Sequence, residues 1–410
     1  MPSKNVDYSL YLVTDSTNAI LGDKDLVQVV QKAVEGGATI VQYRDKTSDT
    51  ADLVRIAKDL HAVTRPANIP LLINDRVDVA LAAGVEGVHV GQDDMDLATA
   101  RKVLGPDAII GVTANNLEEA IEAAKGGADY LGIGTVYATP TKENTKSVIG
   151  TAGVQHILSE LVKNGHGQVK TVCIGGVNAS NCQRILYQSA SPQKSLDGIA
   201  VVSAIMASSQ PKEAAAHLKT LVSTPPPFAT SLSKAALSRD DVVSKAPGIN
   251  FAANVALAVG SSPIMSNNGL EADDLASLGG ALVINMGTTT PDVRGNHLKA
   301  LAAYNAVGGP VLLDPVGAGA TEQRREGVRA LMRGGYFDLI KGNEGEIRTV
   351  SGAQGVKQHG VDSGASQLQL EDRVKLVRGI AAREHSVVLM TGSTDVISDG
   401  GEDVHDREWT

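Results

Sequence analysis

The chain has 410 residues and a formal net charge of −9, and 42% of its residues are hydrophobic. That apolar fraction is enough to build packed cores, which excludes a disordered or low-complexity protein. The acidic balance, with only one Trp, eight Tyr and three Phe, also argues against a nucleic-acid binder, which needs a basic face and stacking rings.

The sequence contains no run of about 18 apolar residues, so we expect no membrane-spanning helix. Its first residues lack the apolar core of a signal peptide and the Arg-rich character of a transit peptide. The two cysteines, Cys173 and Cys182, form no CxxC pair, and no Cys/His spacing typical of zinc sites occurs. These features predict reduced thiols and a cytoplasmic protein without a zinc site.

The first half of the chain alternates β-branched runs with helical patterns that end in Gly. Near-continuous apolar strands that alternate with helices predict a parallel sheet covered on both faces. Eight such strands in about 200 residues indicate a small (β/α)₈ TIM barrel. An open doubly wound sheet is the alternative, although no GxGxxG follows any strand. The predicted strands are 8–15, 38–45, 70–75, 87–91, 108–113, 130–137, 170–177 and 198–205.

A Pro/Ser/Ala-rich segment, 223–241, is the clearest break in composition. Three consecutive prolines favour an extended backbone, so we interpret this segment as a linker between domains at 1–222 and 242–410. The second domain shows the same alternation with fewer units and predicts an open α/β layer domain. Its expected strands are 281–288, 310–319, 337–346 and 386–397, and a polar tail follows residue 399.

Basic residues follow the second predicted strand, where side chains at alternate positions share a direction. Gln42, Arg44 and Lys46 are so spaced, and Arg and Lys both suit phosphate oxygens. An ion pair with Asp45 is the structural alternative. Because barrel enzymes carry their chemistry at the carboxyl ends of strands, we favour an anion site.

Carboxylates follow the third and fourth predicted strands. The third ends in Asn74 and Asp75, and the fourth runs through His89 to Asp94. Two carboxylates on adjacent strand ends suit Mg²⁺, which shares the rest of its shell with water and phosphates. Taken singly, each Asp also fits a helix cap. His89 lies within the strand and fits a hydrogen-bonded core residue better than a ligand.

The last three strand ends carry hydroxyls, glycines and one cation. Small residues before helix amino termini leave N–H groups free for phosphate, and the seventh and eighth strands usually hold that site in barrels. Together, the strand ends predict a phosphorylated, Mg²⁺-bound substrate. The residues concerned are Thr139, Thr141, Lys142, Gly176, Val202 and Ser203.

The motifs QYRDK, IND, VHVGQDD, GTVYATPTK, IGGV and VVSAI, in this order, make residues 8–221 resemble thiamine phosphate synthase. That family joins 4-amino-2-methyl-5-hydroxymethylpyrimidine diphosphate to hydroxyethylthiazole phosphate and releases pyrophosphate. The resemblance implies that pyrophosphate leaves first, and that the thiazole nitrogen captures the resulting pyrimidine cation. No protein nucleophile is then required.

The same resemblance implies a role for each matching residue. Asp75 and Asp94 would hold Mg²⁺, and Lys142 would neutralise the leaving group together with Arg44 and Lys46 as catalytic cations. The pyrimidine diphosphate would contact Gln42, Arg44, Lys46 and Asn74, with Thr113 in the place of a family Ser. The thiazole phosphate would contact Thr139, Thr141, Gly176, Val202 and Ser203.

The second half resembles hydroxyethylthiazole kinase, a ribokinase-like family, through APGINFAANVALAVGSSPIM, ALVINMGT, PVLLDPVGAGAT, IKGNEGEI and VVLMTGSTDVI. That family phosphorylates the thiazole alcohol with ATP. The resemblance implies thiazole contact at Met265, Mg²⁺ and phosphate at Asp314 and Glu346, and ATP contacts at Arg324 and Thr391. A core position for Met265 and a turn for Asp314 are the structural alternatives.

The order synthase then kinase resembles the fungal bifunctional thiamine-biosynthesis family, and we expect a homo-oligomer. The family's Thr-Gly-x-Gly-Cys turn is not found in this sequence, so we expect a partial kinase domain, truncated at its C-terminal end, with weak kinase activity. One alternative is a synthase whose second half only binds or assembles. Another is a different phosphate-binding barrel, such as an isomerase or aldolase; an aldolase, however, requires a Schiff-base Lys within a strand.

Overall fold

The computed structural model describes residues 5–139, 148–231, 261–287, 290–353, 368–401 and 405–407. The chain divides into two compact units, Met1–Pro225 and Pro226–Thr410. In the part of the chain that is described, no helix combines the length and the apolar character needed to cross a membrane.

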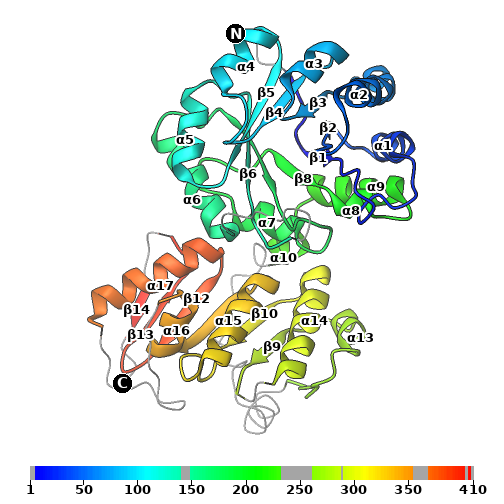
Figure 1. Ribbon diagram of the computed structural model, residues 1–410. Helices are drawn as coiled ribbons and strands as arrows, with labels where there is room; N and C mark the ends of the chain where they lie inside the picture. Colours follow the sequence, from blue (N-terminus) through cyan, green and yellow to red (C-terminus); the bar gives the residue numbers. More distant parts are fainter. Residues whose placement is uncertain are drawn as a thin grey trace. The chain divides into compact units, whose positions relative to one another are not determined.

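The strands of the first unit are β1 (Leu10–Val13), β2 (Ile40–Tyr43), β3 (Leu71–Asn74), β4 (Gly87–Val90), β5 (Ile109–Ala114), β6 (Tyr130–Gly134), β7 (Lys170–Ile174) and β8 (Gly198–Val201). They form a closed parallel barrel in sequence order, because β1 pairs with both β2 and β8. Helices surround the strands (Figure 1). These are α1 (Leu26–Glu35), α2 (Thr50–Thr64), η1 (Arg65–Ala67), α3 (Val77–Ala83), α4 (Leu97–Leu104), α5 (Leu117–Lys125), α6 (Gly150–Lys163), α7 (Cys182–Gln188), α8 (Ser203–Met206) and α9 (Pro211–Ser223).

The barrel follows from strands that are apolar on both faces. All four side chains of β1 (LYLV) and of β2 (IVQY) are buried, as a parallel sheet covered by helices requires. Several helices begin at a capping side chain: Asp25, Asp96 and Asn116 each accept a hydrogen bond from the backbone N–H three residues ahead. The predicted TIM barrel is confirmed.

The turn after β8 differs from the expectation of a strand over 198–205. The strand ends at Val201, because Val202 leaves the extended conformation with a ψ of −85°. Helix α8 then begins at Ser203. Val202 and Ser203 therefore lie in the strand-to-helix turn at the carboxyl end of the barrel.

The second unit contains a mixed six-stranded sheet in the order β14-β13-β12-β11-β10-β9. Strands β9 to β12 are parallel, and β13 and β14 are antiparallel to their neighbours. The strands are β9 (Leu282–Asn285), β10 (Val311–Asp314), β11 (Leu339–Asn343), β12 (Val387–Thr391), β13 (Asp395–Ser398) and β14 (His405–Arg407). The helices are α10 (Pro227–Ser231), α13 (Ala272–Ser277), α14 (Pro291–Val307), α15 (Glu322–Gly334), α16 (Glu344–Val350) and α17 (Leu370–Glu384).

Three features of this sheet differ from the sequence-based expectation. The run 386–397 is a hairpin of β12 and β13, because Gly392 donates its N–H to the Asp395 carboxylate at 2.9 Å and turns the chain. The expected polar tail contains β14, which pairs with β13. The expected strand 337–346 ends at Asn343, which caps α16. The α/β sheet class itself is confirmed.

A short helix lies inside the segment that we interpret as a linker. Helix α10 belongs to the second unit, where Phe228 is 5% exposed and stacks on Tyr336 with ring centroids 4.7 Å apart. Residues 232–241 of the segment lie outside the described residues. The five residues of α10 are therefore helical instead of extended.

Candidate active site

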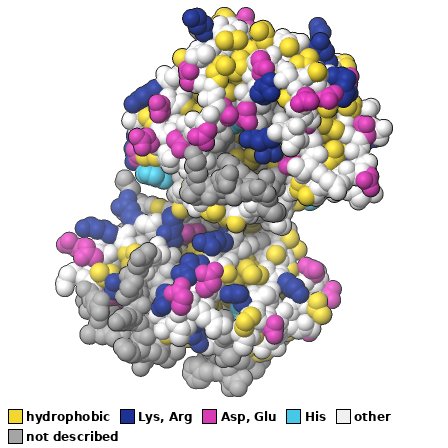
Figure 2. Space-filling model, viewed as in Figure 1, with side chains coloured by type: hydrophobic (Ala, Val, Ile, Leu, Met, Phe, Trp, Pro, Cys, Tyr) yellow, Lys and Arg dark blue, Asp and Glu magenta, His cyan; other side chains and the backbone are white. Residues whose placement is uncertain are grey.

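On the face of the molecule shown in Figure 2, acidic and basic side chains are interspersed. Independently of that view, the described residues include exposed pairs within one helix, such as Lys32 with Glu35 and Arg55 with Asp52. Exposed pairs of this kind contribute little to stability or function. The cations at the carboxyl ends of the barrel strands have different surroundings.

Arg44, directly after β2, is fixed by the end of the neighbouring strand β1. Its backbone N–H donates to Thr14 Oγ1 at 2.9 Å, and its Nη1 contacts Asp15 Oδ2 at 3.4 Å. Asp15 is almost fully buried, and its other oxygen accepts from the N–H and hydroxyl of Thr17 at 2.9 and 2.6 Å. The structure pairs Arg44 with Asp15, which was not considered from the sequence, and not with the expected Asp45.

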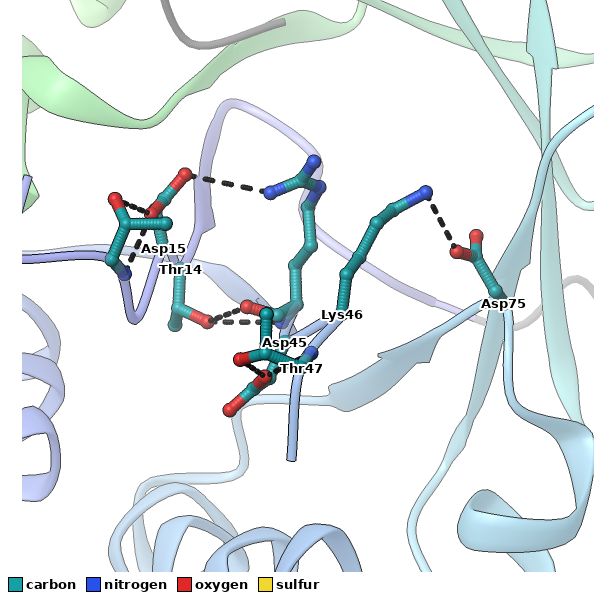
Figure 3. Close-up of polar contacts among 8 residues, drawn as sticks. Thr14, Asp15, Asp45, Lys46, Thr47 and Asp75 are labelled. Atoms are coloured by element: carbon teal, nitrogen blue, oxygen red, sulfur yellow. Dashed lines mark hydrogen bonds and ion pairs between the residues drawn. The ribbon is translucent and has the colours of Figure 1, made fainter. Parts of the chain in front are cut away.

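Lys46 projects from a loop that Asp45 organises. The Asp45 carboxylate accepts hydrogen bonds from Thr47 and Ser48, which lower its pKa although burial acts in the opposite direction. Lys46 Nζ then reaches Oδ2 of Asp75, 3.2 Å away directly after β3 (Figure 3). The structure therefore brings the second and third strand ends together, as predicted.

Asp75 and Asp94 face each other at the ends of β3 and β4. Burial raises the pKa of Asp75, and a hydrogen bond and the negative charge of Asp94 raise it further, while Lys46 opposes the rise. Neither residue is a helix cap, because α3 begins after Arg76 and α4 after Asp96. Asp75 also has a φ of +62°, which is uncommon outside Gly and indicates a functional constraint on the backbone.

The Asp75–Asp94 pair fits a hard divalent cation. Two carboxylates that crowd each other are stabilised when a cation neutralises them, and Mg²⁺ takes its remaining ligands from water and phosphate. Within the described residues, no group of three or more His, Cys, Asp or Glu is arranged as a metal site. A two-carboxylate set of this kind therefore suits a metal that arrives with a phosphorylated substrate.

A chain of hydrogen bonds crosses the interior of the barrel below these groups. Gln42 Nε2 donates to Tyr11 OH at 3.0 Å, and Tyr11 OH lies 2.7 Å from Tyr130 OH. His89 then bonds Tyr130 OH at 2.8 Å and Thr113 Oγ1 at 2.9 Å. Both ring nitrogens of His89 are used, which confirms the prediction of a core histidine. Burial raises the pKa of both phenols, so they remain neutral donors and acceptors.

The loop after β7 has the open backbone expected of a phosphate site. Gly175 and Gly176 have φ values of +99° and +68°, and a Cβ on Gly176 would lie 2.8 Å from the Cβ of Tyr137. The Tyr137 hydroxyl accepts a hydrogen bond from the buried Arg184 at 2.6 Å. Thr139 is partly exposed beyond Tyr137, whereas the predicted Thr141 and Lys142 lie outside the described residues.

A second polar cluster lies at the carboxyl ends of β9, β10 and β11. Asp314 accepts from Asn285 Nδ2 at 2.9 Å and lies 3.8 Å from Lys341 Nζ. Burial raises the pKa of Asp314, and Lys341 and Asn285 act against that rise. Glu346 is buried within electrostatic reach of Asp314, and its oxygens accept from the N–H groups of Gly317 and Asn343 at 2.9 and 2.8 Å.

The other three residues predicted for the second unit have different surroundings. The Arg324 guanidinium donates to three backbone carbonyls, those of Met286, Gly287 and Val316, at 2.7–2.9 Å. It therefore ties together the loops after β9 and β10. Thr391 ends β12, and Met265 is 53% exposed, which excludes the core position considered for it.

Several residues of these clusters were not anticipated from the sequence. Asp15 follows the first strand in the same way as the predicted residues follow the others, so the strand-end rule applied to β1 would have found it. Asn285 and Lys341 lie within the motifs ALVINMGT and IKGNEGEI, but neither was predicted as a site residue. Tyr11 and Tyr130 are 119 positions apart, and nothing local predicts their contact.

The closed barrel, with cations and paired carboxylates at the carboxyl ends of its strands, defines the first unit as a TIM-barrel enzyme. Family models match both halves of the chain: thiamine monophosphate synthase over residues 10–205 and the hydroxyethylthiazole kinase family over residues 243–406. The probable thiamine biosynthetic bifunctional enzyme of Schizosaccharomyces pombe is 44% identical over 97% of this chain and 79% of its own length. The thiamine biosynthetic bifunctional enzyme of Saccharomyces cerevisiae is 38% identical over 97% and 78%.

The chain belongs to the family of bifunctional thiamine biosynthetic enzymes, with a thiamine-phosphate synthase domain followed by a hydroxyethylthiazole kinase domain. Among solved structures, thiamine phosphate pyrophosphorylase from Pyrococcus furiosus is 36% identical and covers 53% of this chain and 96% of its own, with a TM-score of 0.45. Hydroxyethylthiazole kinase from Pyrococcus horikoshii is also 36% identical and covers 37% and 54%, with a TM-score of 0.32.

Proposed function

We propose that the first unit condenses 4-amino-2-methyl-5-hydroxymethylpyrimidine diphosphate with hydroxyethylthiazole phosphate to give thiamine phosphate and pyrophosphate. One observation carries the proposal: the Asp75–Asp94 pair and the cations Arg44 and Lys46 share one end of the barrel. Paired carboxylates beside two cations suit a diphosphate that brings a divalent metal. The families of the two domains imply Mg²⁺ and ATP.

The residues of this cluster act on the leaving group. When bound, Mg²⁺ supplies positive charge to the diphosphate oxygens, and Asp75 and Asp94 are the residues that would hold it. Arg44 and Lys46 bind the same oxygens and stabilise the charge that grows as the carbon–oxygen bond breaks. Lys142 would join them from the loop after β6. The thiazole nitrogen then captures the pyrimidine cation, so no side chain forms a covalent bond.

The interior hydrogen-bond chain orients the pyrimidine. Gln42 and Thr113 lie at its two ends, and each is fixed by a buried hydroxyl or imidazole. Side chains held in this way do not have to be ordered when substrate binds, which favours catalysis by positioning. Asn74, at the end of β3, is a further group that we assign to the pyrimidine diphosphate.

The thiazole phosphate occupies the other side of the barrel mouth. The open glycine backbone at Gly176 and the N–H groups of Val202 and Ser203 approach a phosphate without a side chain in the way. Thr139 and Thr141 add hydroxyl donors. With the pyrimidine diphosphate at the ends of β2 to β4 and the thiazole phosphate at the ends of β6 to β8, the reacting carbon and nitrogen would meet between the two sets of strand ends.

For the second unit we propose ATP-dependent phosphorylation of the thiazole alcohol. The observation that favours it is the buried cluster of Asp314, Lys341 and Glu346, which joins two carboxylates to a cation at strand ends. Asp314 and Glu346 would organise Mg²⁺ and the ATP phosphates, Arg324 and Thr391 would line the nucleotide, and Met265 would contact the thiazole. A homo-oligomer, and the linker boundaries at 223–241, remain predictions.

Two parallel reactions test both proposals. Each contains the full chain, the pyrimidine diphosphate and Mg²⁺; one adds thiazole phosphate, and the other adds thiazole alcohol with ATP. Thiamine phosphate in both reactions supports both activities. Product in the first reaction alone leaves the second unit as a non-catalytic module. Product in neither reaction refutes the synthase proposal and favours a different phosphate-binding barrel enzyme.

A further inference from the structure

We propose that Asp15 is a positioning residue of the synthase site, which acts by holding the Arg44 guanidinium in the orientation that receives the diphosphate. The inference rests on the proposed function. It concerns the end of β1, which supplies no group to the predicted set of substrate and metal ligands. Among the described residues of this cluster, Asp15 contacts Arg44 and neither Lys46 nor the carboxylate pair, so its influence passes through Arg44.

The Asp15 carboxylate is itself fixed before it meets Arg44. It is 3% exposed, and one oxygen accepts two hydrogen bonds from Thr17, through the backbone N–H at 2.9 Å and the hydroxyl at 2.6 Å. That leaves Oδ2 directed at Arg44 Nη1, 3.4 Å away. Figure 3 shows Asp15 next to Thr14 at the end of β1, across from the loop that carries Lys46.

The backbone and the side chain of Arg44 are each held by one of the two residues that directly follow β1. Its backbone N–H donates to Thr14 Oγ1, while Asp15 takes one side of the guanidinium. In the described part of the chain, the guanidinium makes no second side-chain hydrogen bond, and 27% of the side chain is exposed. A guanidinium has five donors in a rigid fork, so the remaining donors face outward in a fixed direction and can receive a phosphate.

A buried carboxylate beside an anion site weakens anion binding unless another effect of the same carboxylate compensates. Its charge opposes a diphosphate, and an almost fully buried Asp requires a partner. Arg44 is that partner. The ion pair restricts the long Arg44 side chain before substrate binds, so less conformational entropy is lost on binding. Asp15 therefore contributes to diphosphate affinity only while Arg44 is present, and opposes it when Arg44 is absent.

The proposal can be tested because the contribution of Asp15 to diphosphate affinity should change sign when Arg44 is removed. Asp15→Asn keeps an oxygen for Thr17 and removes the charge. We expect it to lower kcat/KM for the pyrimidine diphosphate about 10- to 100-fold, the range expected for one hydrogen bond to a charged group, and to leave KM for thiazole phosphate unchanged. In an Arg44→Ala background, the same substitution is expected to leave kcat/KM unchanged or to raise it.

Equal losses in both backgrounds would overturn the proposal, because Asp15 would then act independently of Arg44. An unchanged kcat/KM in the single variant would overturn it as well. Thr17→Val, which removes the 2.6 Å hydroxyl contact to Asp15, is expected to give a smaller loss in the same kinetic constant. A loss that falls equally on both substrates would indicate general disruption of the barrel and would also count against the proposal.

Asp129→Asn provides a matched control. Asp129 pairs with Arg101 at 2.6 Å and is also an Asp paired with an Arg, although its side chain is 20% exposed against 5% for Asp15; it precedes β6 and so lies at the opposite end of the barrel. This variant is expected to reduce thermal stability without changing KM for the pyrimidine diphosphate. Comparison of KM for the pyrimidine diphosphate between Asp15→Asn and Asp129→Asn, at an equal loss of Tm, separates an effect on the position of Arg44 from an effect on stability.

A binding measurement distinguishes failure of this inference from failure of the proposed function. Calorimetric titration of the full chain with inorganic pyrophosphate and Mg²⁺ does not require turnover. We expect Asp15→Asn to weaken pyrophosphate binding about 10-fold or more. If the wild-type chain forms no thiamine phosphate, but Asp15→Asn still binds pyrophosphate more weakly than the wild type, the proposed function fails and the positioning role stands. If turnover is normal and pyrophosphate affinity is the same in both proteins, the positioning role is refuted alone.

Discussion

The sharpest test of the carboxylate pair is Asp94→Asn. The substitution keeps the shape of the side chain and an oxygen that can accept the hydrogen bond from the N–H of Gly91, which measures 2.7 Å in the structure. It removes the negative charge that faces Asp75. Because the loop after β4 keeps its anchor, any loss of activity reports on the charge and not on a collapsed loop.

The expected loss follows from the chemistry of the leaving group. Removing one preorganised group that stabilises transition-state charge costs about 2.7–4 kcal/mol, which corresponds to a fall of about 10²–10³ in kcat. The Mg²⁺ concentration required for half-maximal activity is expected to rise in parallel. Since two like charges no longer crowd each other, the thermal stability of the metal-free chain should stay the same or increase.

The pH dependence of Mg²⁺ binding provides a second test with the same variant. Burial and the Asp94 carboxylate together raise the pKa of Asp75, so removal of the Asp94 charge leaves burial opposed by Lys46 and lowers that pKa. Competition between protons and Mg²⁺ at Asp75 then moves to lower pH, and Mg²⁺ binding by the variant should decline at a lower pH than in the wild type. The assay is thiamine phosphate formation across a Mg²⁺ series at several pH values. Near-normal turnover at low Mg²⁺ would refute the assignment of Asp94 to the metal.

Three further predictions concern the two cores. Burial raises the pKa of Asp338 from 3.8 to about 6, so protonation favours the folded state; stability of the second unit should fall by up to about 3 kcal/mol as pH rises through 6, and urea unfolding of Asp338→Asn should lose this dependence. Phe228→Ala removes a 5% exposed ring that stacks on Tyr336 and should cost the second unit about 3 kcal/mol in the same measurement, with the first unit unaffected. Gly111→Ala places a Cβ 2.0 Å from the Tyr130 ring, so we expect loss of synthase activity and a lower Tm of the first unit; a variant with both intact would show that the tyrosine can move aside.

The sequence predicts the barrel well because each of its strands is a local signal. Seven of the eight barrel strands lie within a run chosen for β-branched residues, and β5 extends one residue beyond its run, to Ala114. The hairpin of β12 and β13 was merged into one strand because apolar residues lie on both sides of the short polar turn around Gly392, so the turn was included in one run. Strand β14 lacks an apolar pattern, and pairing with β13 alone defines it.

The candidate site divides in a similar way. Residues that follow strands, such as Arg44, Lys46, Asp75 and Asp94, were predicted because parallel strands bring their carboxyl ends together. The residues that hold these side chains in place were not predictable, because Asp15 contacts Arg44 from 29 positions away in the sequence. The alternative of helix caps for the two Asp residues could be rejected only from coordinates, because Arg76 and Asp96 begin the helices instead.

The packing of α10 determines where the chain can be divided for work on isolated parts. Helix α9 ends at Ser223, and the ring of Phe228 is already seated against Tyr336 in the second unit. A second unit expressed from residue 242, the boundary that composition suggests, would lack this ring and expose the surface beneath it. Expression from residue 226 retains the helix. A protease cut in the exposed stretch between α9 and α10 would likewise release two parts with their cores intact.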